Sequence, residues 1–208
     1  MSVLVDTHPV SIDWEFHWAP YDMPTYQLVL EHISADDIVL EIGAGDLRLA
    51  RQMADIAGNV YALEMNRSVL EEGLASFHPL SANLIPVCAD ARTFDFPRGI
   101  TSGVLLMRHC THFQLYAEKL REAGCTRLIT NARWGMNVEV VDLQTARISY
   151  KNLELGWYAC WCGTVGFKHG SPEKITPDVE AIIHEIIDCP NCRKNELPDP
   201  KFDAELSL

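Results

Sequence analysis

Short apolar runs alternate with stretches of helical spacing over the first two thirds of this sequence. Residues 24–33 carry apolar side chains with the i, i+3, i+4, i+7 spacing of a helix that buries one face. Residues 38–42 form a nearly all-apolar run, which is typical of a buried parallel strand. Strands that alternate with helices need crossover connections, and these produce a parallel sheet covered on both faces. The pattern therefore predicts a doubly wound, mostly parallel α/β domain over about residues 1–145.

The same pattern sets the expected elements of this domain. We expect strands at 38–42, 59–63, 83–88, 103–107 and 127–130, and helices at 24–33, 47–57, 66–76 and 113–123. The remainder of the 208-residue chain is too short for a second catalytic domain. It is expected to hold strands at 138–143 and 157–167, a helix at 177–187 and a turn at 189–192. We therefore expect a small C-terminal extension over 146–195 and an exposed tail over 196–208.

Four cysteines form two closely spaced pairs in this extension. Cys160 and Cys162 are a C-x-C pair, and Cys189 and Cys192 flank a Pro-Asn turn. Residues two apart on a strand face the same side, so the first pair can converge on one point. Four thiolates are the ligand set of a closed tetrahedral zinc site, which supports folding and leaves no open position for catalysis. The sequence therefore predicts structural zinc in the C-terminal extension.

Other interpretations of the cysteines stay open at this point. His169 or His184 could replace one thiolate, or the four thiols could be two inert reduced pairs. A disulfide is a third option, but a reducing cytoplasm disfavours it. Cys88, Cys110 and Cys125 lie in or beside apolar strand-like segments, where we expect buried free thiols.

The first expected strand ends in a turn that contains Gly43 and Gly45 and leads into a helix. Glycines let the backbone approach a ligand closely, and the start of the helix offers free N–H groups. A third glycine at position 48 would complete the fingerprint of a pyrophosphate-binding site, but this chain has Arg48 there. The turn therefore favours a nucleoside without phosphates.

Two carboxylates follow neighbouring strands at positions suited to such a nucleoside. Glu64 ends the second strand, 19 residues after Gly45, where a carboxylate can accept hydrogen bonds from both hydroxyls of a ribose. Asp90 follows the third strand, where it could accept a hydrogen bond from the exocyclic amine of adenine. The pattern therefore predicts an adenosine-containing ligand.

In these features the chain resembles the class I S-adenosylmethionine-dependent methyltransferases, over about residues 18–131. Residues 38–46 look like the first motif of that family, 61–64 like its ribose-binding strand end and 89–91 like its adenine-edge motif. Residues 21–25 are similar to a Tyr-x-x-Pro-Thr segment that covers the methionine end of the cofactor in several subfamilies. The resemblance implies a Rossmann-like methyltransferase fold with S-adenosylmethionine as the cofactor. The implied contacts with the cofactor are Tyr21, Thr25, Glu41, Gly43, Gly45, Glu64, Met65, Asp90, Ala91 and Arg108.

The chain also departs from the family. Leu47 stands where many relatives have another glycine. Residues 107–113 lack the Asn/Asp-Pro-Pro-aromatic tetrad of relatives that methylate amides and base amines, so that class of acceptor is unsupported. For an amine or hydroxyl acceptor we expect His109 to be the general base, with Arg108 or His112 orienting it. A thiolate or arsenical acceptor would need no base.

The charge balance bears on the choice of partner. With 17 basic and 29 acidic residues the formal net charge is −12, which repels a phosphate backbone. We therefore expect a small molecule or a protein side chain as the acceptor and regard nucleic acid as disfavoured. The first residues lack the basic region of a signal peptide and no apolar run approaches the length of a membrane span, so we expect a cytoplasmic protein without a membrane partner.

Two alternative functions remain from the sequence. One is a catalytically degenerate methyltransferase fold that binds a partner protein through its zinc element. The other is a nicotinamide-dependent oxidoreductase, which Arg48 disfavours because the third glycine is absent.

Overall fold

The computed structural model describes residues 18–108, 110–134 and 137–192. Its larger sheet consists of β1 (Ile38–Ile42), β2 (Asn59–Glu64), β3 (Leu84–Cys88), β4 (Ser102–Leu105), β5 (Arg127–Thr130) and β6 (Glu139–Asp142). The strand order is β3-β2-β1-β4-β5-β6. All neighbours pair in parallel except β6, which is antiparallel to β5. The order reverses between β1 and β4, and in such sheets ligands bind beyond the carboxyl ends of the strands at that point.

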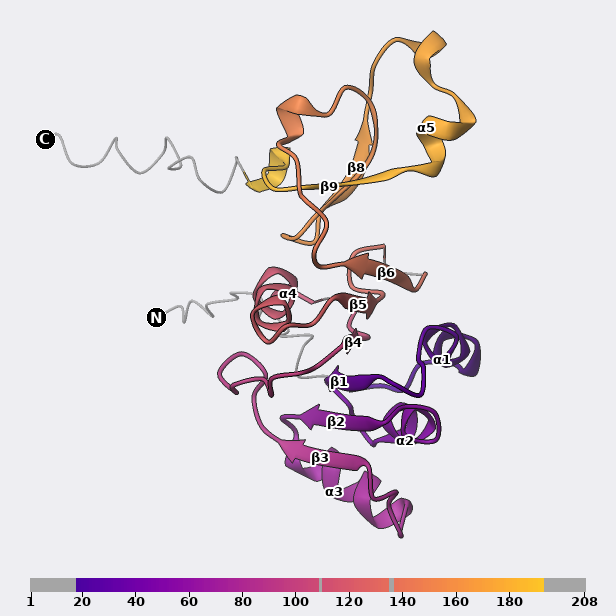
Figure 1. The fold of residues 1–208 in the computed structure, drawn as a ribbon, viewed down its shortest axis with the longest axis vertical. Coiled ribbons are helices and arrows are strands. Elements are labelled where there is room, and N and C mark those ends of the chain that lie inside the picture. Colours follow the sequence, from indigo (N-terminus) through magenta and orange to yellow (C-terminus); the bar gives the residue numbers. More distant parts are fainter. Residues whose placement is uncertain (1–17, 109, 135–136, 193–208) are drawn as a thin grey trace, which may run out of the picture.

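Helices cover both faces of this sheet (Figure 1). They are α1 (Met23–Leu30), α2 (Arg48–Ala54), α3 (Arg67–Ser76) and α4 (Phe113–Glu122). Alternate strand residues face opposite layers, so Val39 packs in the layer that includes α1 and α2, while Leu40 packs in the layer that includes α4. The predicted doubly wound α/β fold is confirmed.

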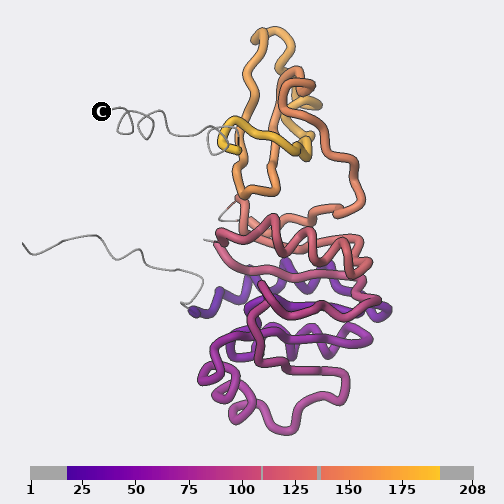
Figure 2. Tube along the Cα trace, turned by 90° about the vertical axis from the view of Figure 1, so that its left-hand side faces the viewer, coloured from indigo at the N-terminus to yellow at the C-terminus, as the bar shows by residue number. Residues whose placement is uncertain are grey.

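A smaller sheet lies beyond β6, at the end of the molecule opposite β3, as both views show (Figures 1 and 2). It consists of β7 (Gly156–Cys160), β8 (Val165–Lys168) and β9 (Ile183–Ile186), in the order β8-β7-β9. β8 runs antiparallel to β7, and β9 runs parallel to it. The short helix α5 (Pro177–Ala181) lies on the connection from β8 to β9. In the described part of the chain, every helix is too short or too polar to span a bilayer.

Two of the expected elements are wrong in this smaller sheet. The strand expected at 157–167 is two strands, β7 and β8, joined by a turn that contains Cys162. The helix expected at 177–187 ends at Ala181, and β9 follows it at once. Ile186 is fully buried beside Cys160 of β7, because β-branched side chains suit a sheet and β7 offers an open edge there.

The three remaining cysteines differ in burial. Cys125 is buried as expected and Cys110 is half-buried. Cys88, in contrast, is exposed, because it is the last residue of the edge strand β3. The expected tail over 196–208 lies outside the described residues.

Candidate functional site

The turn after β1 is built around its two glycines. Gly43 has φ +75° and Gly45 has φ +56°, a left-handed region that favours glycine. The N–H groups of Gly43 and Ala44 both donate to the carbonyl oxygen of Leu63, at 2.8 and 2.9 Å. These bonds tie the turn to the end of the neighbouring strand β2.

Glu64 lies against this turn, as its spacing from Gly45 predicted. The N–H of Gly45 donates to Glu64 Oε2 at 2.9 Å. The N–H of Asn66 donates to Glu64 Oε1 at 2.7 Å, just before α3 begins. The carboxylate is buried at the carboxyl end of β2, and its hydrogen-bond partners among the described residues are these two backbone N–H groups. It is therefore placed where a ribose would meet it in a doubly wound fold.

Glu41 is a second buried carboxylate below the turn, and one of its oxygens is unpaired. It is 5% exposed, and Oε2 has no hydrogen-bond partner among the described residues. Burial, together with the negative charges of Glu64 and Asp46, holds the pKa of the Glu41 carboxyl well above its usual value. Such a group binds either a proton or a cationic ligand.

A cavity of about 330 Å³ opens over the turn, at the switch point between β1 and β4. Its lining includes Glu41 and Gly43 from the end of β1, Leu106 after β4, and Trp18 and Tyr21 before α1. This is the candidate ligand site.

Trp18 covers the glycine turn. A Cβ added to Gly45 would lie 1.8 Å from Trp18 Nε1, so only glycine fits beneath the indole. The guanidinium of Arg48 lies 5.6 Å from the centre of the Trp18 ring and is also held by Asp46 at 2.5 Å. The indole shields the turn from water on this side.

The predicted entry segment lies beside the cavity. Tyr21 Oη accepts a hydrogen bond from the N–H of Arg108 at 3.2 Å, and the Arg108 guanidinium lies 5.0 Å from the Tyr21 ring centre. Thr25 is buried, and its Oγ1 donates to Asp22 Oδ1 at 2.5 Å. That hydrogen bond lowers the pKa of Asp22, which caps the start of α1. Thr25 therefore already has a structural partner.

The predicted adenine-edge residues lie at the end of β3. Arg92 Nη2 binds Asp90 Oδ2 at 2.8 Å, and the side-chain hydrogen bonds from Arg92 lower the pKa of Asp90. The backbone oxygen of Ala91 accepts from Lys119 Nζ at 2.8 Å. Met65 lies half-buried just after Glu64. His109, the predicted general base, lies outside the described residues.

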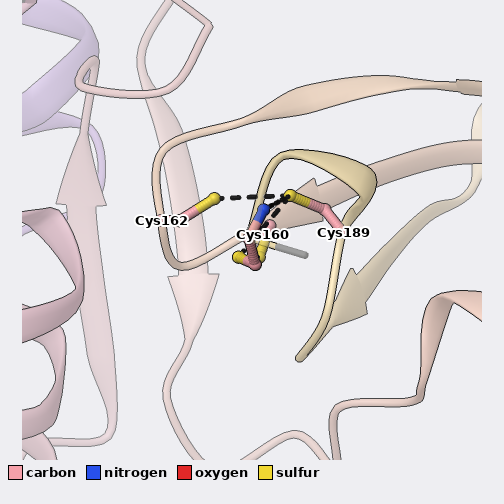
Figure 3. Close-up of side chains that lie close together, drawn as sticks. Cys160, Cys162 and Cys189 are labelled. Atoms are coloured by element: carbon pink, nitrogen blue, oxygen red, sulfur yellow. Dashed lines mark hydrogen bonds between the residues drawn. The ribbon is translucent and has the colours of Figure 1, made fainter. Parts of the chain in front are cut away.

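The four cysteines of the extension converge at one point. Figure 3 shows three of them, Cys160, Cys162 and Cys189. All four Sγ atoms lie within 4.8 Å of one another. The distances are 3.4 Å for Cys162 to Cys189, and 3.7 Å both for Cys160 to Cys192 and for Cys189 to Cys192. A tetrahedral site with Zn–S bonds of about 2.3 Å has sulfurs roughly 3.8 Å apart. None of the four thiols is in a disulfide, so all of them can be metal ligands. The cluster therefore has the ligand type, number and spacing of a structural zinc site.

An ion-pair network joins the two sheets. Arg133, whose side chain is 1% exposed, binds Glu139 of β6 at 2.8 Å and Glu185 of β9 at 2.7 Å. Trp134 Nε1 also donates to Glu139 Oε2 at 3.1 Å, and the Trp134 ring lies 5.9 Å from that of Trp157. Sequence reasoning missed these residues, since their partners lie up to 52 positions away. It also missed Trp18, although only Ala19 and Pro20 separate Trp18 from the segment that resembles a cofactor cover.

Comparisons with known proteins add the following. No family model and no curated protein sequence matches the chain. A precorrin 8W decarboxylase structure from Methanobacterium thermoautotrophicum is 20% identical with a TM-score of 0.47, over 54% of this chain and 63% of that one. A dimethyladenosine transferase from Plasmodium falciparum is 18% identical with a TM-score of 0.47, over 52% and 41%. An rRNA methylase from Streptococcus thermophilus is 15% identical with a TM-score of 0.43, over 51% and 68%.

Methyltransferases are thus among the structures that the chain resembles. The similar region spans less than two thirds of the first two structures, at 63% and 41%. Likenesses this distant carry no conclusion about activity, substrates or partners.

Proposed function

We propose that this chain is an S-adenosylmethionine-dependent methyltransferase. The observation that supports this most is the contact between Glu64 and the N–H of Gly45 at 2.9 Å, beside a cavity at the switch point of the sheet. The cofactor supplies a methyl group already activated on a sulfonium, so alignment and exclusion of water are the main tasks of the protein. Trp18 and Tyr21, which line the cavity, are suited to exclude water.

The charges of the cavity fit this cofactor. Asp46 is paired with Arg48, whereas the unpaired oxygen of Glu41 remains free for a cation. S-adenosylmethionine carries an ammonium and a sulfonium, and Glu64 would hold the ribose hydroxyls. A dinucleotide would instead bring two phosphates toward these carboxylates, which disfavours a nicotinamide-dependent oxidoreductase.

Calorimetry with S-adenosylmethionine and S-adenosylhomocysteine tests the proposal. We expect dissociation constants in the micromolar range for both, and no heat from a nicotinamide dinucleotide. A purified protein that binds neither adenosyl ligand would not be a methyltransferase of this type. Retention of the nicotinamide dinucleotide would instead favour the oxidoreductase.

For the acceptor, we propose a small molecule or a protein side chain, since the net charge of −12 opposes a phosphate backbone. Arg108 is hydrogen-bonded to Tyr21, which lines the cavity, and the assignment of His109 as general base remains a prediction. A tritiated methyl donor incubated with candidate acceptors at pH 6 to 9 tests both. If His109 is the base, the methylation rate decreases at pH values below the pKa of the imidazole, which is about 6.5 when unperturbed.

We propose that Cys160, Cys162, Cys189 and Cys192 hold one structural zinc ion. The sulfur spacing supports this, and the metal would join the ends of β7 and β9. The smaller sheet would thereby be fixed against the turn that follows β5, through Glu185 and Arg133. The metal would therefore shape the acceptor side of the cavity without taking part in the reaction.

A second candidate function is a partner-binding protein on a degenerate methyltransferase fold. The observation that favours it is a set of exposed isoleucines on the C-terminal element: Ile182 is 52%, Ile183 is 47% and Ile187 is 52% exposed. Cofactor binding without methyl transfer to any acceptor tested would favour this candidate over the enzyme.

A further inference from the structure

The side-chain amide of Asn131 is buried and has no hydrogen-bond partner in the part of the chain that the structure describes. Asn131 directly follows β5 and is 1% exposed. Neither its Oδ1 nor its Nδ2 makes a hydrogen bond within the described residues. Asn83 is different, because its Nδ2 donates to the backbone oxygens of Ala54 and Ala57 at 2.9 and 3.0 Å. A buried amide that is unpaired at both ends destabilises a fold, so its presence calls for a ligand or a water.

The alternation of the strand shows which face Asn131 occupies. Leu128 and Ala132 belong to the layer that includes α4, whereas Ile129 belongs to the layer that includes α1 and α2. Side chains two apart share a face, so the Asn131 amide lies on the side of α1 and α2. Ile129 pairs with Val104, and Val104 pairs with Glu41, which puts Glu41 on this same face.

The pairing of the strands also shows which residues lie next to Asn131. Leu105 pairs with Thr130, and Thr130 pairs with Glu139. One step further along, Asn131 falls between Leu106 and Val138, which both pack against the layer of α1 and α2. Leu106 also lines the candidate ligand cavity together with Tyr21. The amide is therefore adjacent to Leu106, which lines the cavity beyond the carboxyl ends of the strands. The second substrate would lie on this side, next to a cofactor bound at the glycine turn.

The turn that carries Asn131 is held firmly. Thr130 Oγ1 donates to the carbonyl oxygen of Leu105 at 2.7 Å and accepts from the N–H of Ala132 at 3.0 Å. Arg133 is fixed by Glu139 and Glu185. A polar group with supported neighbours on both sides is a preorganised binding contact.

We propose that Asn131 is a specificity-determining residue that binds the methyl acceptor, an inference that rests on the proposed function. The side-chain carboxamide presents an N–H donor and a carbonyl oxygen acceptor side by side. The ligand group that complements it is planar and neutral, with an acceptor facing that N–H and a donor facing that oxygen. A primary carboxamide and the amino edge of adenine both have this arrangement. The apolar flanks, Leu106 and Val138, suit a planar ring. This is a binding contact, distinct from the atom that receives the methyl group.

The test uses small probes and the full chain. Nicotinamide offers the carboxamide and adenosine offers the nucleobase edge, while 3-acetylpyridine and purine riboside lack the donor and serve as matched controls. S-adenosylhomocysteine is added in excess, so that adenosine does not enter the cofactor site. We expect one of the two probes, at about ten times its dissociation constant, to raise Tm by roughly 3 to 6 °C, and its control to raise Tm much less.

Variants assign this shift to Asn131. Asn131→Leu should lose the shift but leave Tm of the ligand-free protein unchanged or raised, because it removes an unpaired amide. Asn131→Asp should lose most of the shift, since it removes the donor. Asn83→Leu should lower the ligand-free Tm and keep the shift, because Asn83 is paired within the fold.

Four results would overturn the inference: no shift with either probe, an equal shift with the matched control, an equal shift in Asn131→Leu, or a large loss of ligand-free stability in that variant. The last would assign Asn131 a structural role through a buried water. Calorimetry with S-adenosylhomocysteine separates this failure from that of the proposed function. A protein that binds nicotinamide or adenosine through Asn131 but does not bind S-adenosylhomocysteine contradicts the proposed methyltransferase function. A protein that binds S-adenosylhomocysteine but neither probe contradicts only the proposed role of Asn131.

Discussion

At the level of single residues, the three carboxylates around the glycine turn carry their charge in different ways. Asp46 is paired with Arg48, and Glu64 accepts two backbone N–H groups. Glu41 has one oxygen without a partner in the described part of the chain. The three therefore differ in what a substitution should do.

Glu64→Gln should weaken the binding of S-adenosylhomocysteine by about ten- to a hundredfold. The neutral amide loses the charge that strengthens hydrogen bonds to ribose hydroxyls, a loss of roughly 1.5 to 3 kcal/mol. Calorimetry measures the change. Glu71→Gln is the matched control, because Glu71 is exposed on α3 and paired only with Arg67 at 3.8 Å. Equal affinity in Glu64→Gln and the parent would remove Glu64 from the site.

Glu41→Gln should change how stability depends on pH in the ligand-free protein. The folded state holds a proton on Glu41 above the usual glutamate value of 4.5, because burial and the charges of Glu64 and Asp46 raise its pKa. The unfolded chain releases that proton first, so the free energy of unfolding falls as pH rises from about 4.5 to the raised pKa.

The Gln variant lacks this contribution. It should be more stable than the parent at neutral pH, and the difference should shrink as pH falls toward 4.5. Urea denaturation between pH 4.5 and 8 measures both proteins. A parallel pH dependence in the two would show that Glu41 has an ordinary pKa.

The sequence predicted part of this site, for a physical reason. Glu64 and Gly45 are 19 residues apart, and one helical crossover returns the chain to the adjacent parallel strand, so the two had to meet. Trp18, Asn131 and Arg133 were not predicted. Their roles depend on contacts that no local pattern encodes, such as an indole over Gly45 or an amide left unpaired between strand ends.

At the level of elements, the smaller sheet has little apolar core of its own and should depend on metal. We expect one equivalent of zinc in the purified protein, measured by elemental analysis. Cys189→Ser should lose this metal and lower Tm, because each ligand of a closed site contributes to folding. Cys88→Ser, which changes an exposed cysteine of β3, should keep both. A metal-free wild-type chain with an unchanged Tm in strong chelator would contradict a structural zinc.

Arg133→Met should destabilise the protein by about 3 to 5 kcal/mol, because it leaves Glu139 and Glu185 largely buried without their cation. Urea denaturation measures this loss. Adding Glu139→Gln and Glu185→Gln to the variant should restore part of it. Lys174→Ala, which removes a cation from an exposed ion pair with Glu154, should leave unfolding unchanged. A small loss in Arg133→Met would mean that the two sheets are joined by packing alone.

The predictions for elements were better in the large sheet than in the small one. All five parallel strands were expected within one or two residues at either end, since buried parallel strands are continuous apolar runs. The sequence predicted one helix over residues 177–187, whereas the helix ends at Ala181. The residues after Ala181 form β9 because they pair with the free edge of β7, and no local sequence pattern predicts that pairing.

At the level of the whole molecule, the net charge of −12 should oppose binding to RNA. A fluorescent single-stranded RNA should show no binding to the protein at micromolar concentrations and about 0.15 M salt. Binding that is submicromolar and falls steeply with salt would reveal a local basic surface and make nucleic acid the acceptor to test next.

The central position of β1 has a consequence for the chain during its synthesis. One edge of β1 pairs with β2, and its other edge pairs with β4, which is synthesised later. The N–H of Ile38, at the start of β1, donates to Thr101 Oγ1, 63 residues further along the chain. A nascent chain leaving the ribosome therefore exposes an apolar strand edge until that later segment has emerged. Exposed edges of this kind recruit other chains, so slow translation or crowded expression should favour aggregates over monomers.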